Sequence, residues 1–586
     1  MEKWYVAAKK ADFNKWAEEF QISPVLARIL RNRDLTEEAQ VRQFLYGTLE
    51  DCPSHWLLND MDRAVDELLS AIGENCKIRV IGDYDVDGIC SSYLLTKGLQ
   101  ILGADADTAI PHRIHDGYGL NDNLIEEAKR DGVGLILTCD NGIAAASQIA
   151  LANSLQIRVI VTDHHEVPYQ EENGEKKYLL PPADAIVNPK QEDCPYPNKG
   201  LCGAAVAFKL IQVLYPAMGI EAAKAMEFLE NAAFATVGDV MDLTGENRIL
   251  VKEGLKKLNH TTNFGMRALA AKNNIPMGTL KSYHIGFVLG PCLNASGRLD
   301  TAKRALELLL ARNEAEAASC ATDLYDLNAS RKELTEAGVE QAKALVEETE
   351  LKKDKVLVIY LPECHESLAG IIAGRIRERY HRPVFVLTRG EEGVKGSGRS
   401  IESYSMYDEM VKCSHLFTKF GGHPMAAGLS MPEENVDIFR QQMNENTTLT
   451  EEDLLPKIMI DVPMPLDYIS KGLIEELKCL EPFGKSNEKP VFADKNIRLL
   501  SMRIIGKNQN VCKMQVESQA GTRMEAVYFG NIQEMLAFYK EKYGEQALEQ
   551  TLRGNGGMML ASFVYYPEVN EYNGRESLQI IVKNYC

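Results

Sequence analysis

Short apolar runs that alternate with helical patterns constrain the fold of this chain most strongly. Four such runs lie in the N-terminal half, at residues 78–81, 134–138, 157–162 and 185–187. Continuous apolar runs of this length, separated by segments long enough for a helix, are typical of parallel strands that are buried on both faces. We therefore expect an α/β domain built on a parallel sheet.

Length and charge limit the classes of protein that fit this chain. It has 586 residues, which is typical of several domains, and no run approaches the roughly 18 apolar residues that a membrane helix needs. The 84 acidic and 65 basic residues give a net charge of −19. This charge argues against a protein that coats nucleic acid through bulk positive charge, so any contact with nucleic acid must be local.

The cysteines indicate a reducing compartment. Their number, 13, is odd, and none of them form a C-x-x-C pair. This pattern favours free thiols over a disulfide framework and argues against a thiolate zinc site. Because the chain also begins without the apolar stretch of a secretory signal, we expect a cytoplasmic protein with no membrane segment.

Changes of pattern along the chain indicate five segments. Residues 314–348 are rich in Ala, Leu, Glu and Lys and contain no proline, so we expect a long connecting helix, with two helices bent at Gly338 as the alternative. Glycine-rich turns are expected at 396–398 and 421–423, and the short C-terminal strands, with a hairpin turn at Asn573-Gly574, are typical of a small barrel such as an oligonucleotide-binding fold. The expected segments are an N-terminal helical and mixed segment at 1–70, an α/β domain at 71–300, the connecting helix at 301–350, a second α/β domain at 351–450 and the β-barrel at 451–586.

Three aspartates at alternate positions follow the first apolar run. Asp83, Asp85 and Asp87 stand directly before Gly88. One of them could cap the next helix, but three neighbouring carboxylates repel one another unless a cation neutralises them. A calcium EF-hand loop is excluded because it needs a preceding helix and a glutamate six residues after the glycine, where this chain has Leu94. The pattern therefore indicates a different metal site.

Two more predicted strands end in groups of the same kind. Asp140 follows the second run, and Asp163, His164 and His165 follow the third. Since the carboxyl ends of parallel strands meet at one edge of a sheet, we expect these groups to face one another. Singly, Asp140 could be a helix cap and His164 a core histidine. Their coincidence at three successive strand ends favours a shared site.

The types of ligand limit the choice of metal. Asp239, after a further apolar stretch, adds another carboxylate. Carboxylate and imidazole ligands without thiolate favour manganese or magnesium over structural zinc. Several shared carboxylates suggest two ions, which would activate water and stabilise charge on a phosphoryl group.

Together these residues resemble the DHH phosphoesterase superfamily, and within it the RecJ family of single-strand-specific 5′ to 3′ DNA exonucleases. The superfamily pattern consists of Asp85-x-Asp87, Asp140, Asp163-His164-His165 and Asp239. The motifs that indicate the RecJ family, spread over most of the chain, are Pro111-His112-Arg113, Gly117-Tyr118-Gly119-Leu120-Asn121, Asn294-Ala295-Ser296-Gly297-Arg298-Leu299, Gly396-Ser397-Gly398-Arg399-Ser400, Phe420-Gly421-Gly422-His423, Ala426-Ala427-Gly428 and Pro482-Phe483-Gly484.

The resemblance implies the fold and the centre of the site. The fold would be a DHH phosphoesterase domain joined by a long helix to a DHH-associated α/β domain, followed by an OB-like barrel. Asp83 would lie beside the metal site, Asp163 would support the histidines, and His165 would face the scissile phosphate as a catalytic residue. Asp140, also catalytic, would bridge two Mn²⁺ ions, with Mg²⁺ as the alternative metal. The implied metal ligands are Asp85, Asp87, Asp140, His164 and Asp239.

The resemblance also implies contacts to DNA. Residues 375–399 contain six arginines and Lys395 against three glutamates, a local basic track in an acidic protein. Arg399 also fits an ordinary turn, and Tyr565, Tyr566 and Tyr572 could either stack on bases or be buried in the barrel. The implied phosphate-binding and DNA-binding residues are Arg113, Arg298, Ser397, Arg399 and His423.

The implied function is metal-dependent 5′ to 3′ exonuclease activity on single-stranded DNA in repair and recombination, with a single-strand-binding protein and a helicase as partners. One alternative is a DHH phosphodiesterase acting on nanoRNA or cyclic dinucleotides. Another is a non-catalytic replication scaffold, which would have lost ligand acids. One segment departs from the family pattern: Cys364-His365-Glu366-Ser367 stands where relatives commonly have tryptophan followed by His-Pro-Gly. We expect the wall of the cleft to differ there and keep His365 as a further phosphate-facing candidate.

Overall fold

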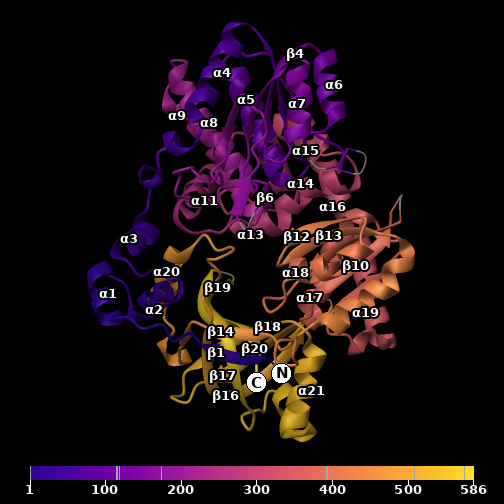
Figure 1. The fold of residues 1–586 in the computed structure, drawn as a ribbon. Coiled ribbons are helices and arrows are strands. Elements are labelled where there is room, and N and C mark those ends of the chain that lie inside the picture. The colour runs from indigo at the N-terminus through magenta and orange to yellow at the C-terminus, as the bar shows by residue number, and fades with distance from the viewer. Residues whose placement is uncertain are drawn as a thin grey trace. The chain divides into compact units, whose positions relative to one another are not determined.

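The computed structural model describes residues 2–113, 116–117, 119–172, 175–390, 393–506, 508–572 and 574–586. The chain forms two compact units, each drawn in Figure 1. The first contains Cys52–Met241 and Leu250–Pro456, and the second contains Glu2–Asp51, Asp242–Ile249 and Lys457–Cys586. Within the part of the chain that the structure describes, no helix has the length and apolar content that a membrane crossing requires.

The first unit contains a five-stranded sheet in the order β3-β2-β4-β5-β8, with every neighbouring pair parallel. The four predicted buried strands are confirmed, and the edge strand β3 is an addition. From β2 the chain passes first to β3 on one side and then to β4 on the other. The strand order therefore reverses between β2 and β4, which is where α/β sheets bind ligands. The strands are β2 (Lys77–Ile81), β3 (Ala106–Ala109), β4 (Val133–Cys139), β5 (Arg158–Thr162) and β8 (Ala185–Val187).

Helices cover both faces of this sheet. Apolar residues of α6 and α7 pack with strand residues such as Ile136 and Val159 on one face. On the opposite face, α5 packs against α8 and α10, which are rich in buried residues. The helices are α4 (Met61–Gly73), α5 (Val86–Ile101), α6 (Asp122–Arg130), α7 (Ala146–Ser154), α8 (Gly203–Ala217), α9 (Ala222–Ala225), α10 (Leu229–Gly238), α11 (Gly245–Leu258), α12 (Phe264–Lys272), α13 (Ser282–His284), α14 (Gly290–Leu299) and α15 (Lys303–Leu310). A π-helix at Ile285–Leu289 and a hairpin of β6 (Tyr169–Glu172) and β7 (Glu175–Tyr178) complete this part.

The predicted connecting helix is one continuous helix, α16 (Glu314–Glu348), capped by the side chain of Asn313. The helix continues through Gly338 without a break. A Cβ added at Gly338 would lie 2.5 Å from Cδ1 of Ile372, so this glycine allows α16 and α17 (Ala369–Tyr380) to approach closely. The structure therefore excludes the two-helix alternative.

The sheet that follows α16 contains both parallel and antiparallel pairs and has the order β12-β13-β11-β10-β9. The prediction of glycine-rich turns at 396–398 and 421–423 was wrong, because both segments lie within strands. Cβ atoms added at Gly396 and Gly398 would meet Leu387 and Phe385, so these glycines make room for side chains of the neighbouring strand. The elements are β9 (Leu357–Tyr360), α17 (Ala369–Tyr380), β10 (Val384–Arg389), β11 (Val394–Arg399), α18 (Met406–Lys412), β12 (Lys419–His423), β13 (Ala426–Met431) and α19 (Val436–Asn446).

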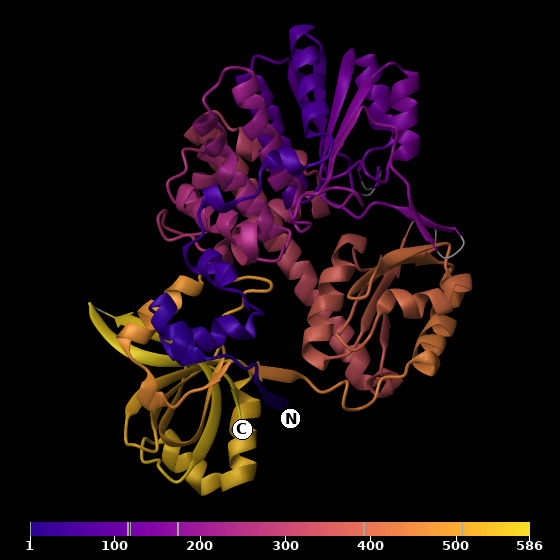
Figure 2. The same ribbon diagram turned by 60° about the vertical axis from the view of Figure 1, so that its left-hand side comes forward.

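The second unit is a barrel, whose strongly curved strands are drawn in orange and yellow in Figure 2. Its strand order is β15-β16-β17-β18-β20-β19, and pairing of β16 with β19 closes it. The expected OB-like barrel is confirmed. Its elements are β14 (Lys457–Ile460), β15 (Val462–Pro463), α20 (Lys471–Leu477), β16 (Phe492–Ile505), β17 (Val511–Glu517), β18 (Arg523–Phe529), α21 (Ile532–Tyr543), α22 (Glu545–Leu552), β19 (Leu560–Tyr572) and β20 (Arg575–Tyr585).

The first residues of the chain belong to this barrel unit. Strand β1 (Lys3–Val6) pairs in parallel with β14, and buried residues of the next helices share the core of the barrel. Arg248 belongs to Asp242–Ile249, the short middle segment of the second unit. It is fully buried and donates hydrogen bonds to the backbone carbonyls of Phe44, Cys479 and Leu480. The helices are α1 (Phe13–Phe20), α2 (Pro24–Asn32) and α3 (Glu38–Tyr46).

The barrel tyrosines differ in burial. Tyr565 is fully buried and its hydroxyl donates to the carbonyl of Met464, so it is a core residue and cannot stack on bases. Tyr566 is half-buried, with Nζ of Lys489 lying 4.8 Å from the ring centroid. The side chain of Tyr572 and the residue Asn573 of the expected hairpin turn lie outside the described residues.

Candidate metal centre and phosphate pocket

The loop between β2 and α5 carries the first three aspartates. Asp85 is the N-cap of α5, because its side chain accepts hydrogen bonds from the backbone N–H groups of Asp87 and Gly88. Asp83 is buried, and burial together with the nearby Asp85 carboxylate raises the pKa of Asp83 to about 8. The cap therefore fixes Asp85 while Asp83 is held in the interior.

Asp87 lies inside α5 and is completely buried. Its carboxylate accepts hydrogen bonds from the backbone N–H groups of Gly203 at 2.6 Å and Ala204 at 2.8 Å, the first residues of α8. The N-terminus of a helix favours a negative charge. Burial nevertheless raises the pKa of Asp87, so its charged form needs further compensation.

Asp140 follows β4 in the left-handed backbone conformation, with φ 60°. The N-terminus of α8 closes over it: a Cβ added at Gly203 would lie 2.7 Å from Cβ of Asp140. Burial, followed by the charges of Asp87, Asp85 and Asp83, raises the pKa of Asp140 well above its usual value. The ionised forms of such crowded, buried carboxylates are stable only with a compensating positive charge.

Asp163 organises the end of β5. One of its oxygens, Oδ1, accepts from the backbone N–H groups of His164 and His165 and lies 2.8 Å from Nδ1 of His165. The other oxygen accepts from the backbone N–H of Ile143. Burial alone would raise the pKa of Asp163, but the hydrogen bond to His165 holds it below its usual value. These bonds use both oxygens of Asp163 for support.

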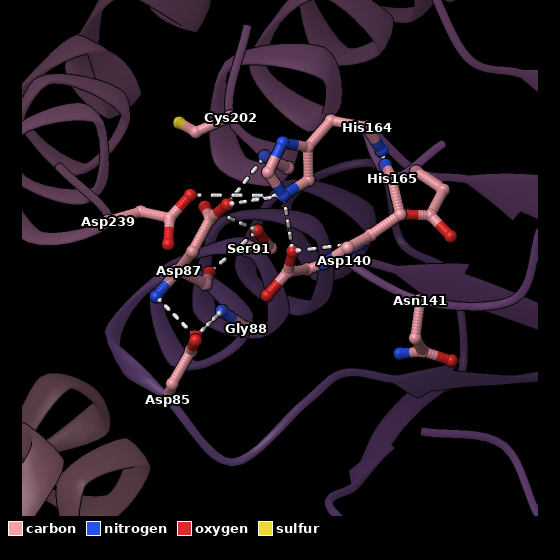
Figure 3. Close-up of polar contacts among 12 residues, drawn as sticks. Asp85, Asp87, Gly88, Ser91, Asp140, Asn141, His164, His165, Cys202 and Asp239 are labelled. Carbon is pink, nitrogen blue, oxygen red and sulfur yellow. Dashed lines mark hydrogen bonds and ion pairs between the residues drawn. The ribbon is translucent and has the colours of Figure 1, made fainter. Parts of the chain in front are cut away.

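The imidazole of His164 lies at the centre of the carboxylates, as Figure 3 shows. Its Nε2 is 2.9 Å from Oδ1 of Asp140, 3.5 Å from Oδ2 of Asp87 and 3.9 Å from Oδ2 of Asp239. Asp239 is the C-cap of α10. Burial lowers the pKa of His164, which favours the neutral imidazole that binds metals.

The side chains brought together here fit divalent cations. Three groups of side chains have ligand atoms within 4.8 Å of one another, and Asp140 and His164 each belong to two of them. Oδ1 of Asp83 and Nδ1 of His164 are also buried without a hydrogen-bond partner in the described structure. The three groups are Asp83, Asp85 and Asp140; Asp87, His164 and Asp239; and Asp140, His164 and His165.

Two asparagines support this centre without being predicted as site residues. Asn141 donates from Nδ2 to the carbonyls of Ile81 and Cys139 and so joins the ends of β2 and β4. Oδ1 of Asn294 accepts from the backbone N–H of Val86, at the start of α5. The signal for Asn294 was its place at the head of a family motif.

A pocket with a volume of about 560 Å³ contains four of the five predicted DNA-binding residues. Its lining includes Arg113, Arg298, Ser397 and Arg399 but not His423, which is exposed on β12. His365 does not line it either and instead accepts a hydrogen bond from the backbone N–H of Ser367. Tyr118 of the corresponding motif lies outside the described residues.

The arginines of the pocket are crowded and held by neutral partners. The guanidinium of Arg113 lies 4.5 Å from the ring centroid of Tyr84, and Nη1 of Arg298 donates to the carbonyl of Ser367 at 2.8 Å. Burial, followed by the charges of Arg113, Arg331 and Arg399, lowers the pKa of Arg298 to about 10. A pocket with this excess of positive charge fits a phosphate group.

Only part of the predicted basic track lines the pocket. Lys395 and Arg399 line the pocket. In contrast, Arg382 donates to backbone carbonyls, Arg389 pairs with Glu363, and Arg379 lies 3.7 Å from a carboxylate oxygen of Glu347. Two of the three glutamates in the charge count, Glu391 and Glu392, lie outside the described residues. Counting charges along the chain therefore overestimates the basic surface.

Comparisons with known proteins agree with the motifs. Family models match as the DHH family N-terminal domain over residues 77–236, the DHHA1 domain over 353–448 and the RecJ OB domain over 460–584. The single-stranded-DNA-specific exonuclease RecJ of Escherichia coli is 34% identical over 586 residues, 96% of each chain.

Solved structures give the same result for the fold. The crystal structure of Thermus thermophilus RecJ with Mn²⁺ matches all of this chain and 79% of that one, with a TM-score of 0.81 and 26% identity. The Mg²⁺ complex of the same protein matches all of this chain and 78% of that one, with a TM-score of 0.74 and 25% identity. With a full-length relative at this identity and a shared domain order, this chain belongs to the RecJ family.

Proposed function

We propose that this protein is a metal-dependent exonuclease that removes nucleotides from the 5′ end of single-stranded DNA during repair and recombination. One observation carries the proposal. Tyr84 lines the phosphate pocket, while its two chain neighbours, Asp83 and Asp85, belong to a carboxylate group suited to a metal. A terminal phosphate in the pocket therefore lies near the place where the next phosphodiester can be cleaved.

The residue types support Mn²⁺ as the cofactor, with Mg²⁺ as the alternative. We propose that Asp85, Asp87, Asp140, His164 and Asp239 hold two ions, with Asp140 shared between them. This assignment rests on the overlapping groups that share Asp140 and His164. When bound, such ions activate water and stabilise the charge that develops on the phosphoryl oxygens.

His165 is suited to act at the scissile phosphate. Its side chain is 43% exposed, whereas that of His164 is 8% exposed, so His165 can reach a substrate. Burial alone would lower the pKa of His165, but the hydrogen bond to Asp163 and the charge of that carboxylate raise it to about 9. A protonated His165 can donate a hydrogen bond to a phosphoryl oxygen and stabilise the transition state.

The pocket supports recognition of the 5′ end. Arg113, Arg298, Ser397 and Arg399 offer several donors in one place, and guanidinium groups bind phosphate oxygens in a directional way. We keep His423 as a proposed DNA contact outside the pocket. The barrel unit supplies an oligonucleotide-binding fold, as expected of an enzyme that acts on strands rather than on dinucleotides. This favours the exonuclease over a nanoRNA or cyclic-dinucleotide phosphodiesterase.

A digestion assay tests the proposal. A 5′-phosphorylated single strand of about 20 nucleotides, longer than one OB-fold binds, is incubated with protein and Mn²⁺, with a blunt duplex and a 5′-blocked strand as controls. We expect shortening of the free single strand alone. Equal attack on the duplex, or preferential hydrolysis of a competing dinucleotide, would refute the proposal. Binding to a single-strand-binding protein or a helicase, and a cytoplasmic location, stay predictions from the resemblance.

A further inference from the structure

Glu366 brings a negative charge into the wall of the phosphate pocket. It is the one acidic residue among the described residues that line this pocket, together with five basic ones. Its side chain is only 25% exposed, and Oε2 lies 2.8 Å from Nζ of Lys395. An acid at this position opposes the binding of an anion.

Lys395 belongs to the same surface as the predicted phosphate ligands. It lies on β11 with Ser397 and Arg399, and alternate residues of a strand point to the same face. All three line the pocket. The Glu366 carboxylate therefore engages an ammonium group that would otherwise be available to a phosphate in the pocket.

The backbone around Glu366 is fixed beside the pocket. His365, the residue before it, is the N-cap of the short helix Glu366–Leu368 and accepts from the backbone N–H of Ser367. The carbonyl of Ser367 accepts a hydrogen bond from Arg298, itself part of the pocket. The main chain of Glu366 therefore lies between two hydrogen-bonded neighbours, and its carboxylate is positioned by the ion pair with Lys395.

We propose that Glu366 is a specificity-determining residue that weakens binding of a 5′-terminal phosphate relative to a 5′-terminal hydroxyl. The inference rests on the proposed function, because it assigns the pocket to the 5′ end of the strand. A terminal phosphate must displace the carboxylate from Lys395 and also approaches a like charge. A hydroxyl end meets neither cost.

Binding without divalent metal tests this inference. Fluorescence anisotropy with two single strands that differ only in the 5′ phosphate gives the discrimination between the two ends. Removal of one charge from a partly buried pocket is expected to raise the affinity of Glu366→Gln for the phosphorylated strand about fivefold, with little change for the hydroxyl strand. Glu366→Asp keeps the charge and is expected to retain the wild-type ratio of affinities.

A matched control comes from the same loop. Glu363 pairs with Arg389 at 3.1 Å, is 83% exposed and does not line the pocket. Glu363→Gln removes the same charge and is expected to leave the ratio of affinities unchanged. In the Glu366→Gln variant Lys395 is available to the phosphate. Adding Lys395→Met to that variant is therefore expected to reduce the affinity for the phosphorylated strand again.

The outcomes separate this inference from the proposed function. If Glu366→Gln melts at the wild-type temperature and leaves the ratio of affinities unchanged, or if Glu363→Gln changes it equally, the inference is wrong. If Glu366→Gln unfolds, the Glu366→Asp variant decides. A ratio of affinities for the two strands that differs from wild type overturns the inference, and the wild-type ratio supports it. Failure of the proposed function appears separately, as wild-type protein with Mn²⁺ that shortens neither strand.

Discussion

Nδ1 of His165 lies 2.8 Å from Oδ1 of Asp163, the same oxygen that accepts hydrogen bonds from two successive backbone N–H groups. This arrangement sets both the orientation and the protonation of the imidazole. Asp163 lies within a motif of proposed metal ligands, but its own contacts are to the neighbouring His165 and to the backbone. Supporting groups of this kind determine how well a reactive side chain is positioned.

Asp163→Asn is expected to lower activity by acting on His165. The amide keeps the size of the side chain but removes the charge that holds the pKa of His165 at about 9. We expect that pKa to fall to its usual range or below, because burial is then less opposed, and the rate on single-stranded DNA to fall about 10- to 100-fold. A pH–rate profile with NMR titration of the histidines measures both effects. A wild-type profile in Asp163→Asn would contradict this role.

His165→Ala is expected to reduce turnover much more than strand binding. In the proposed function the imidazole, which lies 2.8 Å from Asp163, stabilises charge at the scissile phosphate, whereas the residues that line the pocket bind the strand end. Loss of a group of this kind typically costs about 10²- to 10⁴-fold in rate. Single-turnover digestion and strand binding, measured on the same variant, separate the two effects. Equal losses in rate and affinity would make His165 a binding residue.

Gly203→Ala is expected to damage the metal centre from the side of α8. The new Cβ would lie 2.7 Å from Cβ and 2.9 Å from Cα of Asp140, and backbone atoms cannot easily move away. We expect a loss of stability of about 1–3 kcal/mol and weaker Mn²⁺ binding, measured by thermal unfolding and calorimetry.

Gly374→Ala is the matched control for that substitution. Gly374 lies inside α17, and no heavy atom lies within 4 Å of an added Cβ. Alanine is expected to stabilise the helix by about 0.5–1 kcal/mol and to leave Mn²⁺ binding unchanged. If both variants behave alike, close packing at Gly203 is not the cause of the effect.

Glu230→Gln is expected to stabilise the protein, more at high pH than at low pH. Burial raises the pKa of Glu230 to about 6, although Thr261 donates a hydrogen bond to its carboxylate. The folded state therefore binds a proton more tightly than the unfolded state, and this contribution to stability is lost as pH rises from the unfolded pKa through about 6. Glutamine can accept the same hydrogen bond without ionising. We expect a gain of about 2 kcal/mol at pH 8 and less than half of that at pH 5, measured by chemical denaturation. A gain independent of pH would contradict the assignment.

The first sheet shows which parts of the fold were predictable from the sequence. The runs at β2, β4, β5 and β8 were recognisable because both faces of these strands are covered, so apolar residues continue along each strand. Strand β3, with the sequence Ala106-Asp107-Thr108-Ala109, lies at the edge of the sheet and has no such run. Its place depends on pairing with β2, which no local pattern reveals.

Glycine was the least reliable local signal. Glycines at 396 and 398 are typical of a turn, but these positions lie in β11, where Leu387 and Phe385 of the neighbouring strand fill the space of the missing side chains. Gly338 is compatible with a bend in a helix, but in this protein it permits close helix packing. Local sequence cannot distinguish a glycine needed for a backbone angle from one needed for space.

Site residues that follow strand ends could be predicted from the sequence. Residues whose role depends on a tertiary contact could not. Asp140 and His164 were found because parallel strands end at one edge of the sheet. Glu366 was visible only as a departure from the family pattern, since its partner Lys395 lies on β11, distant in the sequence. Tyr565 could not be assigned from sequence, because only the closed barrel shows that it is buried.

The most direct test of this account compares wild-type protein with Asp140→Asn on a 5′-phosphorylated single strand labelled at its 3′ end, in the presence of Mn²⁺. Among the described residues Asp140, like His164, belongs to two of the three ligand groups, so its loss is expected to weaken metal binding in both of them. We predict progressive shortening from the 5′ end by the wild-type protein, and none by Asp140→Asn although it remains folded. Full activity of Asp140→Asn, or wild-type activity that persists after chelation of all divalent metal, would contradict the account.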